Sequence, residues 1–180
     1  MTTHIALLRA VNTSGNRAVK MPELRDFARD LGLANVRTFI QSGNLVFKTS
    51  EPTGFALERL LEEEAAKRLG LQTDFIVRTA EEWKRIIADN PLPDYAERDP
   101  SHLLVFPLKQ ARNPQDFLSL QNAVAGPEIV RGKGKEAYIA YPNGIGRSRL
   151  TISVIERHLG TRSTGRNWNT VLKLGVLAGC

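Results

Sequence analysis

Residues 37–48 place the strongest constraint on the fold of this 180-residue chain. Two runs rich in β-forming residues flank Ser42-Gly43, and such a pair is a turn signal because glycine accepts a positive φ angle. We therefore predict a β-hairpin with a two-residue loop, in which Thr38 faces Phe47. One face of this hairpin is apolar and comprises Val36, Thr38, Ile40, Leu45 and Phe47. The other face mixes polar and apolar groups and comprises Arg37, Phe39, Gln41, Asn44, Val46 and Lys48.

Strands and helices alternate around the predicted hairpin. A buried strand is expected over residues 4–11, and a helix over 22–31 begins with a proline in its first turn. A second helix over 55–69 ends at Gly70, and a strand follows over 74–78. The resulting order, β-α-β-β-α-β, is that of a ferredoxin-like unit.

The order of elements restarts in the second half of the chain, but a closing helix follows where the first unit has its last strand. After a linker over 91–100, we expect a strand over 102–106, a helix ending near 124, a hairpin around Gly132-Lys133-Gly134, and helices over 148–159 and 167–178. We therefore predict an α+β fold in which two ferredoxin-like (βαββαβ) units in tandem pack into one compact body. The first unit, with an extra helix, is assigned residues 1–90, and the second unit residues 101–180.

The composition is typical of a globular cytoplasmic protein. Hydrophobic residues make up 42% of the chain, which is enough for a sizeable core. The single cysteine, Cys180, has no partner for an intramolecular disulfide. No basic segment precedes the apolar run at residues 5–8, and that run is too short for a signal peptide or a membrane span. We expect no membrane partner, and the oligomeric state stays open.

The net charge of +6 is concentrated in the last third of the chain. Residues 131–173 contain nine lysines and arginines against two glutamates, whereas the remaining residues contain 16 basic and 17 acidic side chains. Such asymmetry predicts an anionic partner, for example nucleic acid. The cations that we expect to contact it are Arg131, Lys133, Lys135, Arg147 and Arg149. The alternative is a basic surface that is merely solvated.

Three blocks of sequence carry a resemblance to a known family. They cover residues 8–12 with 21–24, residues 36–44, and residues 160–162 with 166–172; their most specific motifs are Gln41-Ser42-Gly43-Asn44 and Arg166-Asn167-Trp168-Asn169-Thr170. On these blocks the chain resembles the domain of unknown function family 1697 (DUF1697), which is common in bacteria. It departs in the first loop, where Ala10 and Ser14-Gly15 replace one glycine and two adjacent glycines. The resemblance implies an α+β fold of two ferredoxin-like units and no established activity.

Signatures of common enzymes and metal sites are incomplete in this sequence. Residues 146–150 lack the last glycine of a nucleophile elbow. Residues 132–137 fit the pattern G-x-G-x-x-A, but a strand rather than a helix is predicted to follow. The three histidines, His4, His102 and His158, lack the spacing of metal ligands. We therefore predict no metal site and no cofactor, and we assign no catalytic residue.

A first group of polar residues lies at the end of the first strand and along the hairpin. Its members are Arg9, Asn12, Arg37, Gln41, Ser42 and Asn44. These side chains are candidates to hold a ligand on the sheet. Alternatively, Gln41 and Asn44 close the turn while Arg37 and Phe39 pack between the two units.

A second group lies at the start of the closing helix. Its members are Arg162, Arg166, Asn167 and Trp168. Free N–H groups at a helix start attract anions, two arginines add charge, and a tryptophan can stack on a base or ring. The alternative is that Asn167 caps the helix and Trp168 is buried in the core.

Three functions agree with these patterns. The leading one is a non-enzymatic module that binds an anionic ligand, such as a nucleic acid, through the basic last third. The second is an enzyme acting on a phosphorylated or carboxylated small molecule, although neither group contains an evident general acid or base. The third is a protein-interaction scaffold that uses an open sheet face.

Overall fold

The computed structural model describes residues 1–9, 19–40, 42–50 and 54–180. Its contacts divide the chain into two compact units. The first unit consists of Met1–Arg85 and Leu174–Cys180, and the second consists of Ile86–Lys173. Residues 174–180, which the sequence assigns to the second half, therefore group with the first unit.

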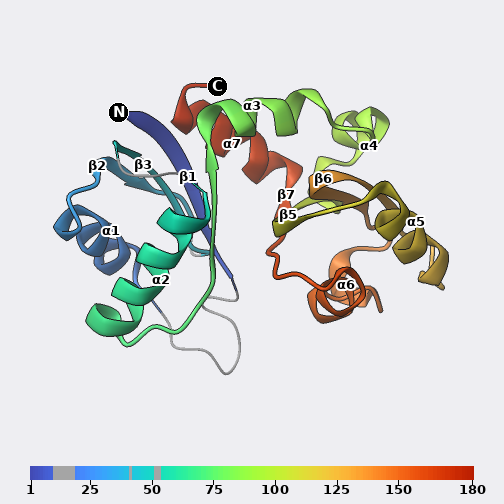
Figure 1. Ribbon diagram of the computed structural model, residues 1–180. Helices are drawn as coiled ribbons and strands as arrows, with labels where there is room; N and C mark the ends of the chain where they lie inside the picture. The colour runs from blue at the N-terminus through green and yellow to red at the C-terminus, as the bar shows by residue number, and fades with distance from the viewer. Residues whose placement is uncertain (10–18, 41, 51–53) are drawn as a thin grey trace. The chain divides into compact units, whose positions relative to one another are not determined.

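The first unit is an antiparallel sheet with two helices on one face (Figure 1). Its elements are β1 (Thr2–Leu8), α1 (Met21–Asp30), β2 (Ala34–Thr38), β3 (Asn44–Thr49), α2 (Phe55–Leu69), β4 (Phe75–Thr79) and the start of α3 (Ala80–Ala88). The strands lie in the order β2-β3-β1-β4. Leu24 and Phe27 of α1 and Leu61 of α2 pack with Leu45 and Phe47 of the sheet to form the core.

Two glutamates attach α2 to the strand β4. Glu58 accepts a hydrogen bond from the backbone N–H of Val77 at 2.9 Å, and Glu62 accepts one from Phe75 at 2.9 Å. The two carboxylates lie one helical turn apart, so they reach alternate residues of the strand. β4 is an edge strand of the sheet, and these contacts pair amide groups that an edge would leave free.

The hairpin formed by β2 and β3 has a longer loop than the sequence predicts. Thr38 pairs with Leu45 rather than with Phe47, so the predicted two-residue loop is wrong. Ile40 has a φ angle of 51° and is 46% exposed, so it belongs to the connection and not to the apolar face. The shift in register is two residues, and side chains alternate with a period of two, so Leu45 and Phe47 keep the predicted core face.

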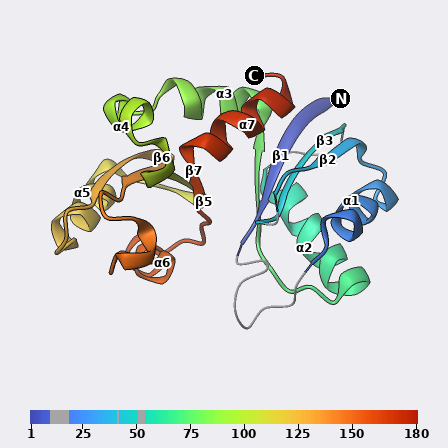
Figure 2. The same ribbon diagram turned by 180° about the vertical axis from the view of Figure 1, so that it is seen from behind.

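The second unit contains a smaller antiparallel sheet with the strand order β6-β5-β7 (Figure 2). Its elements are the end of α3, α4 (Pro93–Arg98), η1 (Pro100–His102), β5 (Leu103–Arg112), α5 (Pro114–Ala123), β6 (Ile129–Ala140), η2 (Ile145–Arg147), α6 (Ile152–Leu159), β7 (Arg166–Asn167) and the start of α7 (Trp168–Ala178). Phe117 of α5 and Ile155 of α6 pack with Phe106, Ile139 and Tyr141 of the sheet. The two units together make an α+β fold.

The predicted hairpin around Gly132 and Gly134 is wrong, because β6 is one continuous strand. A Cβ atom at Gly132 would lie 2.1 Å from the ring of Phe117, so this glycine admits the ring against the strand. Gly134 has a φ angle of 61° and pairs with Arg112, next to a shift in the β5–β6 register. The glycines thus mark a close approach and an irregularity in the ladder rather than a turn.

Two further boundaries differ from those predicted from the sequence. The predicted linker over 91–100 contains α4 and the start of η1. The helix predicted from residue 148 begins only at Ile152, where Thr151 accepts a hydrogen bond from the backbone N–H of Val154 and caps the helix. The segment between β6 and α6 is therefore longer, and it carries Arg147 and Arg149.

Candidate functional site

A cavity of about 360 Å³ lies within the second unit. The end of α5, the segment that follows it, and the segment from Asn143 to α6 form its walls. The wall is largely aliphatic, with contributions from Leu120, Val124, Leu150 and Val154. Pockets of this size and character commonly hold small molecules, with few polar groups to orient them.

Two arginines border this cavity. Arg147 ends η2, Arg149 follows two residues later, and both are exposed. Neither guanidinium has a hydrogen bond or a salt bridge to any residue that the structure describes. A guanidinium offers several N–H donors in a planar fork that suits phosphate and carboxylate. The border of the cavity is therefore able to bind an anion.

Glu128 contributes a carboxylate to the cavity wall. The residue is 9% exposed, and its Oε1 accepts a hydrogen bond from the Ser148 hydroxyl at 2.6 Å. Its Oε2 lies 2.3 Å from the position that a Cβ atom would occupy on Gly126, so the absence of a side chain there makes room for the carboxylate. No hydrogen bond to Oε2 occurs among the described residues. One oxygen is thus held in place while the other can accept a bond from a ligand.

Gln121 and Tyr141 fix the surroundings of this carboxylate. The Gln121 amide donates to the Glu128 backbone carbonyl at 3.2 Å and accepts from the Val130 N–H at 2.6 Å. The Tyr141 hydroxyl donates to the Leu150 carbonyl at 3.0 Å. Burial, and to a smaller extent the charge of Glu128, raises the pKa of Tyr141, so its hydroxyl keeps its proton near neutral pH. Hydrogen bonds therefore fix the cavity wall at Glu128 and at Leu150.

The remaining predicted cations of the basic segment lie on the edge strand β6. Arg131, Lys133 and Lys135 are all exposed. Lys133 is 3.4 Å from Asp89 in an exposed salt bridge, and Arg131 donates to the Gln121 side chain at 3.2 Å. Exposed ion pairs contribute little free energy, so Lys133 can exchange its partner at small cost.

The second predicted group does not form a common site. Arg162 is exposed and lies 3.4 Å from Glu156, whereas Arg166 is buried. Arg166 donates to the Thr164 hydroxyl at 2.8 Å, and desolvation lowers its pKa to about 10, so it stays charged at neutral pH. Asn167 accepts from the backbone N–H of Thr170 at 3.0 Å and caps α7. Trp168 is 6% exposed.

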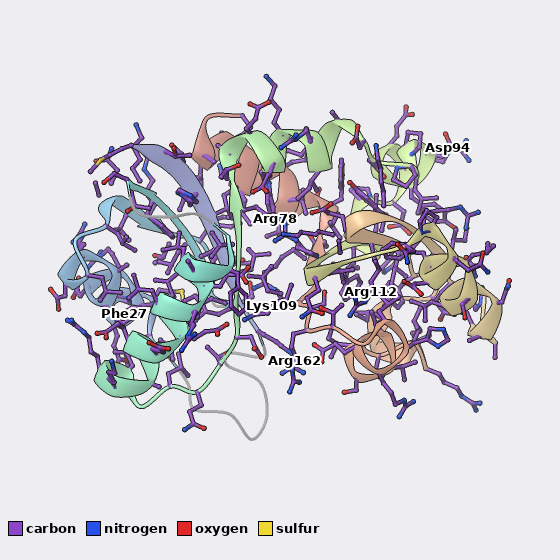
Figure 3. All side chains as sticks on the ribbon, viewed as in Figure 1. Phe27, Arg78, Asp94, Lys109, Arg112 and Arg162 are labelled. Atoms are coloured by element: carbon purple, nitrogen blue, oxygen red, sulfur yellow. The ribbon has the colours of Figure 1, made fainter. Side chains whose placement is uncertain are left out.

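Figure 3 labels three basic residues of this region of the second unit: Lys109, Arg112 and Arg162. The backbone N–H of Lys109 donates to the carbonyl of Arg162 at 3.0 Å. Arg112 donates to the carbonyls of Leu159 and Gly160, at the end of α6. A cation at a helix C-terminus satisfies carbonyls that lack intrahelical partners, so Arg112 has a structural role.

The first predicted group divides into buried and exposed members. Asn44 is fully buried, and its Nδ2 donates to the Phe39 carbonyl at 2.7 Å and to the Ser42 hydroxyl at 3.0 Å. Arg9 is half-buried at the end of β1, where its backbone N–H donates to the carbonyl of Asp74 at 3.0 Å. Asn12 and Gln41 lie outside the described residues. Asn44 and Ser42 therefore close the connection between β2 and β3.

Arg37 is the exposed member of that group. It lies on β2 and borders a second cavity, of about 300 Å³, which Lys48 and the C-terminal residues 176–179 also line. Most of this sheet face is buried, including Ile5, Leu7 and Ile76. The face also carries the buried Arg78, labelled in Figure 3, whose Nη1 donates to the carbonyl of Val77 at 2.9 Å.

The histidines occupy three unrelated environments. His4 is fully buried, stacks on Phe47 with ring centroids 5.7 Å apart, and has no hydrogen-bond partner for Nε2 among the described residues. Burial lowers the pKa of His4. His102 lies 2.7 Å from Asp99, and His158 lies 3.1 Å from the Ser119 hydroxyl. The part of the chain that the structure describes contains no group of three or more His, Cys, Asp or Glu residues placed to hold a metal ion.

Glu128 and Arg78 are missing from the groups predicted from the sequence. Nothing in the local sequence indicates that Glu128 is buried, because its partner Ser148 lies twenty residues further along the chain. Arg78 follows three apolar strand residues, and that position is the only local sign of its burial.

The fold and its elements define an α+β protein built on two antiparallel sheets. The family described as "protein of unknown function (DUF1697)" matches residues 1–138, and the chain belongs to this family. The predicted family is thereby confirmed, and the blocks at residues 8–12 with 21–24 and at 36–44 lie within the matched range, whereas the block at 160–172 lies outside it. No helix within the described ranges has the length and apolar character needed to cross a membrane.

A solved structure shares this fold. The conserved bacterial protein SP0830 from Streptococcus pneumoniae is 21% identical to the chain, with a TM-score of 0.74, and the match covers 98% of each chain. At this level of identity the similarity establishes the fold alone. No curated protein matches the chain.

Proposed function

We propose that the protein is a non-enzymatic module that binds an anionic ligand, and that this ligand is a nucleic acid held by the second unit. The observation that carries the proposal is the set of exposed cations on β6 and on the segment between β6 and α6. Its members are Arg131, Lys133, Lys135, Arg147 and Arg149. Phosphate contacts require such solvent-accessible cations, and they supply most of the affinity of non-specific nucleic-acid binding.

The proposal is also supported by what these cations contact. The guanidinium groups of Arg147 and Arg149 have no hydrogen bond or salt bridge among the described residues, and the Lys133 ammonium has an exposed carboxylate at 3.4 Å. Little free energy is therefore lost when these side chains turn towards a phosphate. Arg78 and Arg166 are not assigned this role, because these arginines are only 3% and 6% exposed.

We also infer that the first unit is ferredoxin-like. The support is its element order, β-α-β-β-α-β, together with the strand order β2-β3-β1-β4 and two helices that pack on one face. For the second unit we infer a reduced version, because its order β6-β5-β7 comprises three strands within the described chain.

Replacing Lys133 and Lys135 with glutamate should weaken binding of a random-sequence single-stranded oligonucleotide by the full-length protein. Wild-type affinity should fall steeply with salt, because phosphate contacts release counterions. If both lysines contact phosphate, the slope of log affinity against log salt should become shallower by about 1.4, since each contact contributes about 0.7 for single strands. Fluorescence anisotropy across a salt series measures both quantities.

The matched control is the double variant Lys20→Glu and Lys84→Glu. Both lysines are exposed residues of the first unit, and the change in net charge is the same. The control should keep most of the wild-type affinity. Equal losses in the two variants would show that only net charge matters, and absence of binding at low salt would refute the nucleic-acid proposal.

A further inference from the structure

We propose that the cavity of the second unit receives one base of the bound strand and selects bases that carry an exocyclic amino group. This inference rests on the proposed function, because it assigns a specificity to the same surface. It draws on three features: an aliphatic wall, a carboxylate with one oxygen available, and two cations at the border.

The aliphatic wall accommodates the faces of a planar base. Leu120 and Val124 come from α5 and its C-terminal end, while Leu150 and Val154 come from the approach to α6 and from α6 itself. Proteins that take a single base out of the stack into a pocket hold it between aromatic or apolar side chains. A volume of about 360 Å³ lies in the range of pockets for small ligands.

The orientation of Glu128 sets the preference. Ser148 holds Oε1 at 2.6 Å, and Oε2 lies 2.3 Å from the position of a Cβ atom on Gly126, so this glycine leaves room for the carboxylate. An ionised carboxylate accepts hydrogen bonds and donates none. It therefore accepts a bond from the amino group of cytosine and repels the carbonyl that uracil presents at the same position.

The arginines at the border supply the contacts to the backbone of the strand. Arg147 and Arg149 flank Ser148, the residue that orients Glu128, so the cations and the carboxylate are linked through three consecutive residues. A phosphate attached to the bound nucleotide would meet a guanidinium fork. One segment of chain thus combines sequence-independent contacts with a base-reading group.

Oligocytidine and oligouridine are suitable probes, because they have the same backbone charge and differ in the group that would face Glu128, an amino group in cytosine and a carbonyl in uracil. The full-length protein should bind oligocytidine more tightly than oligouridine by about tenfold. Glu128→Gln keeps an oxygen for Ser148 and adds an N–H donor, so the preference for cytidine should disappear or reverse. Anisotropy at one fixed salt concentration measures the ratio of the two affinities.

A second variant tests the cavity without altering Glu128. Ala125→Trp should fill the cavity and abolish the preference while leaving the salt dependence of binding in place, because Ala125 is an exposed residue of the wall. Ala111→Trp is the matched control, since Ala111 is an exposed residue of the same unit and is not part of the wall. It should keep the preference.

The outcomes separate this inference from the proposed function. If binding depends on salt but the two oligomers bind with equal affinity, the base-selective cavity is refuted, whereas the proposed nucleic-acid binding is not. If neither oligomer binds at low salt, the proposed nucleic-acid binding is refuted. Titration with cytidine monophosphate and with uridine monophosphate, followed by NMR, then tests the cavity alone. A cytidine preference that is lost in Glu128→Gln supports it, and equal or absent binding overturns it.

Discussion

Trp168→Ala is expected to lower the free energy of unfolding by about 3–5 kcal/mol, the cost of truncating a large buried aromatic side chain. Trp168 begins α7 and is 6% exposed, so its removal leaves a cavity that the surroundings fill only in part. The sequence also allows this tryptophan to stack on a ligand. A stacking residue would have an exposed face and would cost little stability when replaced.

Urea denaturation of the full-length protein measures this loss. Leu172→Ala is the matched control, since Leu172 lies one turn further along α7 and is 40% exposed. Its effect should be no more than about 0.5 kcal/mol, as for most surface substitutions. A loss of similar small size in Trp168→Ala would contradict its structural role and return it to the ligand candidates.

Asn44→Ala is expected to cost about 1–3 kcal/mol, whereas Arg37→Ala should cost about 0.5 kcal/mol or less. The Asn44 side chain is fully buried and donates to Phe39 and Ser42, so its loss removes two hydrogen bonds from partly buried groups. Arg37 is exposed on β2, and solvent replaces whatever contacts its guanidinium makes.

Denaturant melts of the two variants under the same conditions compare them directly. The expected order separates a residue that closes a loop from a residue that remains available to a ligand. A large loss in Arg37→Ala would remove it from the ligand candidates. A negligible loss in Asn44→Ala would mean that its two hydrogen bonds contribute little to the hairpin.

The sequence predicts the first unit well because its signals are local. Apolar periodicity defines α1, and Gly70 ends α2 in a left-handed conformation, as its type suggests. Leu45 and Phe47 lie on the predicted core face, whereas Ile40 does not, and the register is shifted by two residues. Ile40 causes this error, because a β-branched residue rarely adopts the positive φ angle of 51° that it has here.

The second unit is harder to predict because glycine serves several purposes. Gly132 and Gly134 have the composition of a turn, yet one admits the Phe117 ring and the other lies beside a register shift. Sequence alone does not separate a turn from a close approach, since both need a residue without a side chain. The position of the Phe117 ring of α5 shows that Gly132 is a close approach and not part of a turn.

The cations of the candidate site are visible in the sequence, whereas the cavity is not. Arg147 and Arg149 belong to a segment whose charge excess can be counted. The role of Glu128 depends on Ser148 and Gly126, and on the packing of α5 against β6. In the sequence, Glu128 cannot be distinguished from an exposed glutamate, because its partners are brought to it only by the fold.

The most direct test of the account is a map of amide chemical shifts for the ¹⁵N-labelled full-length protein titrated with oligocytidine. If the second unit binds the strand, the largest changes should fall between residues 120 and 158, with Glu128, Leu150 and Val154 among them. The amides of α1 and α2 in the first unit should be unaffected. Changes concentrated around Arg37 and Lys48, with none at Glu128, would contradict the account and place the ligand on the first unit.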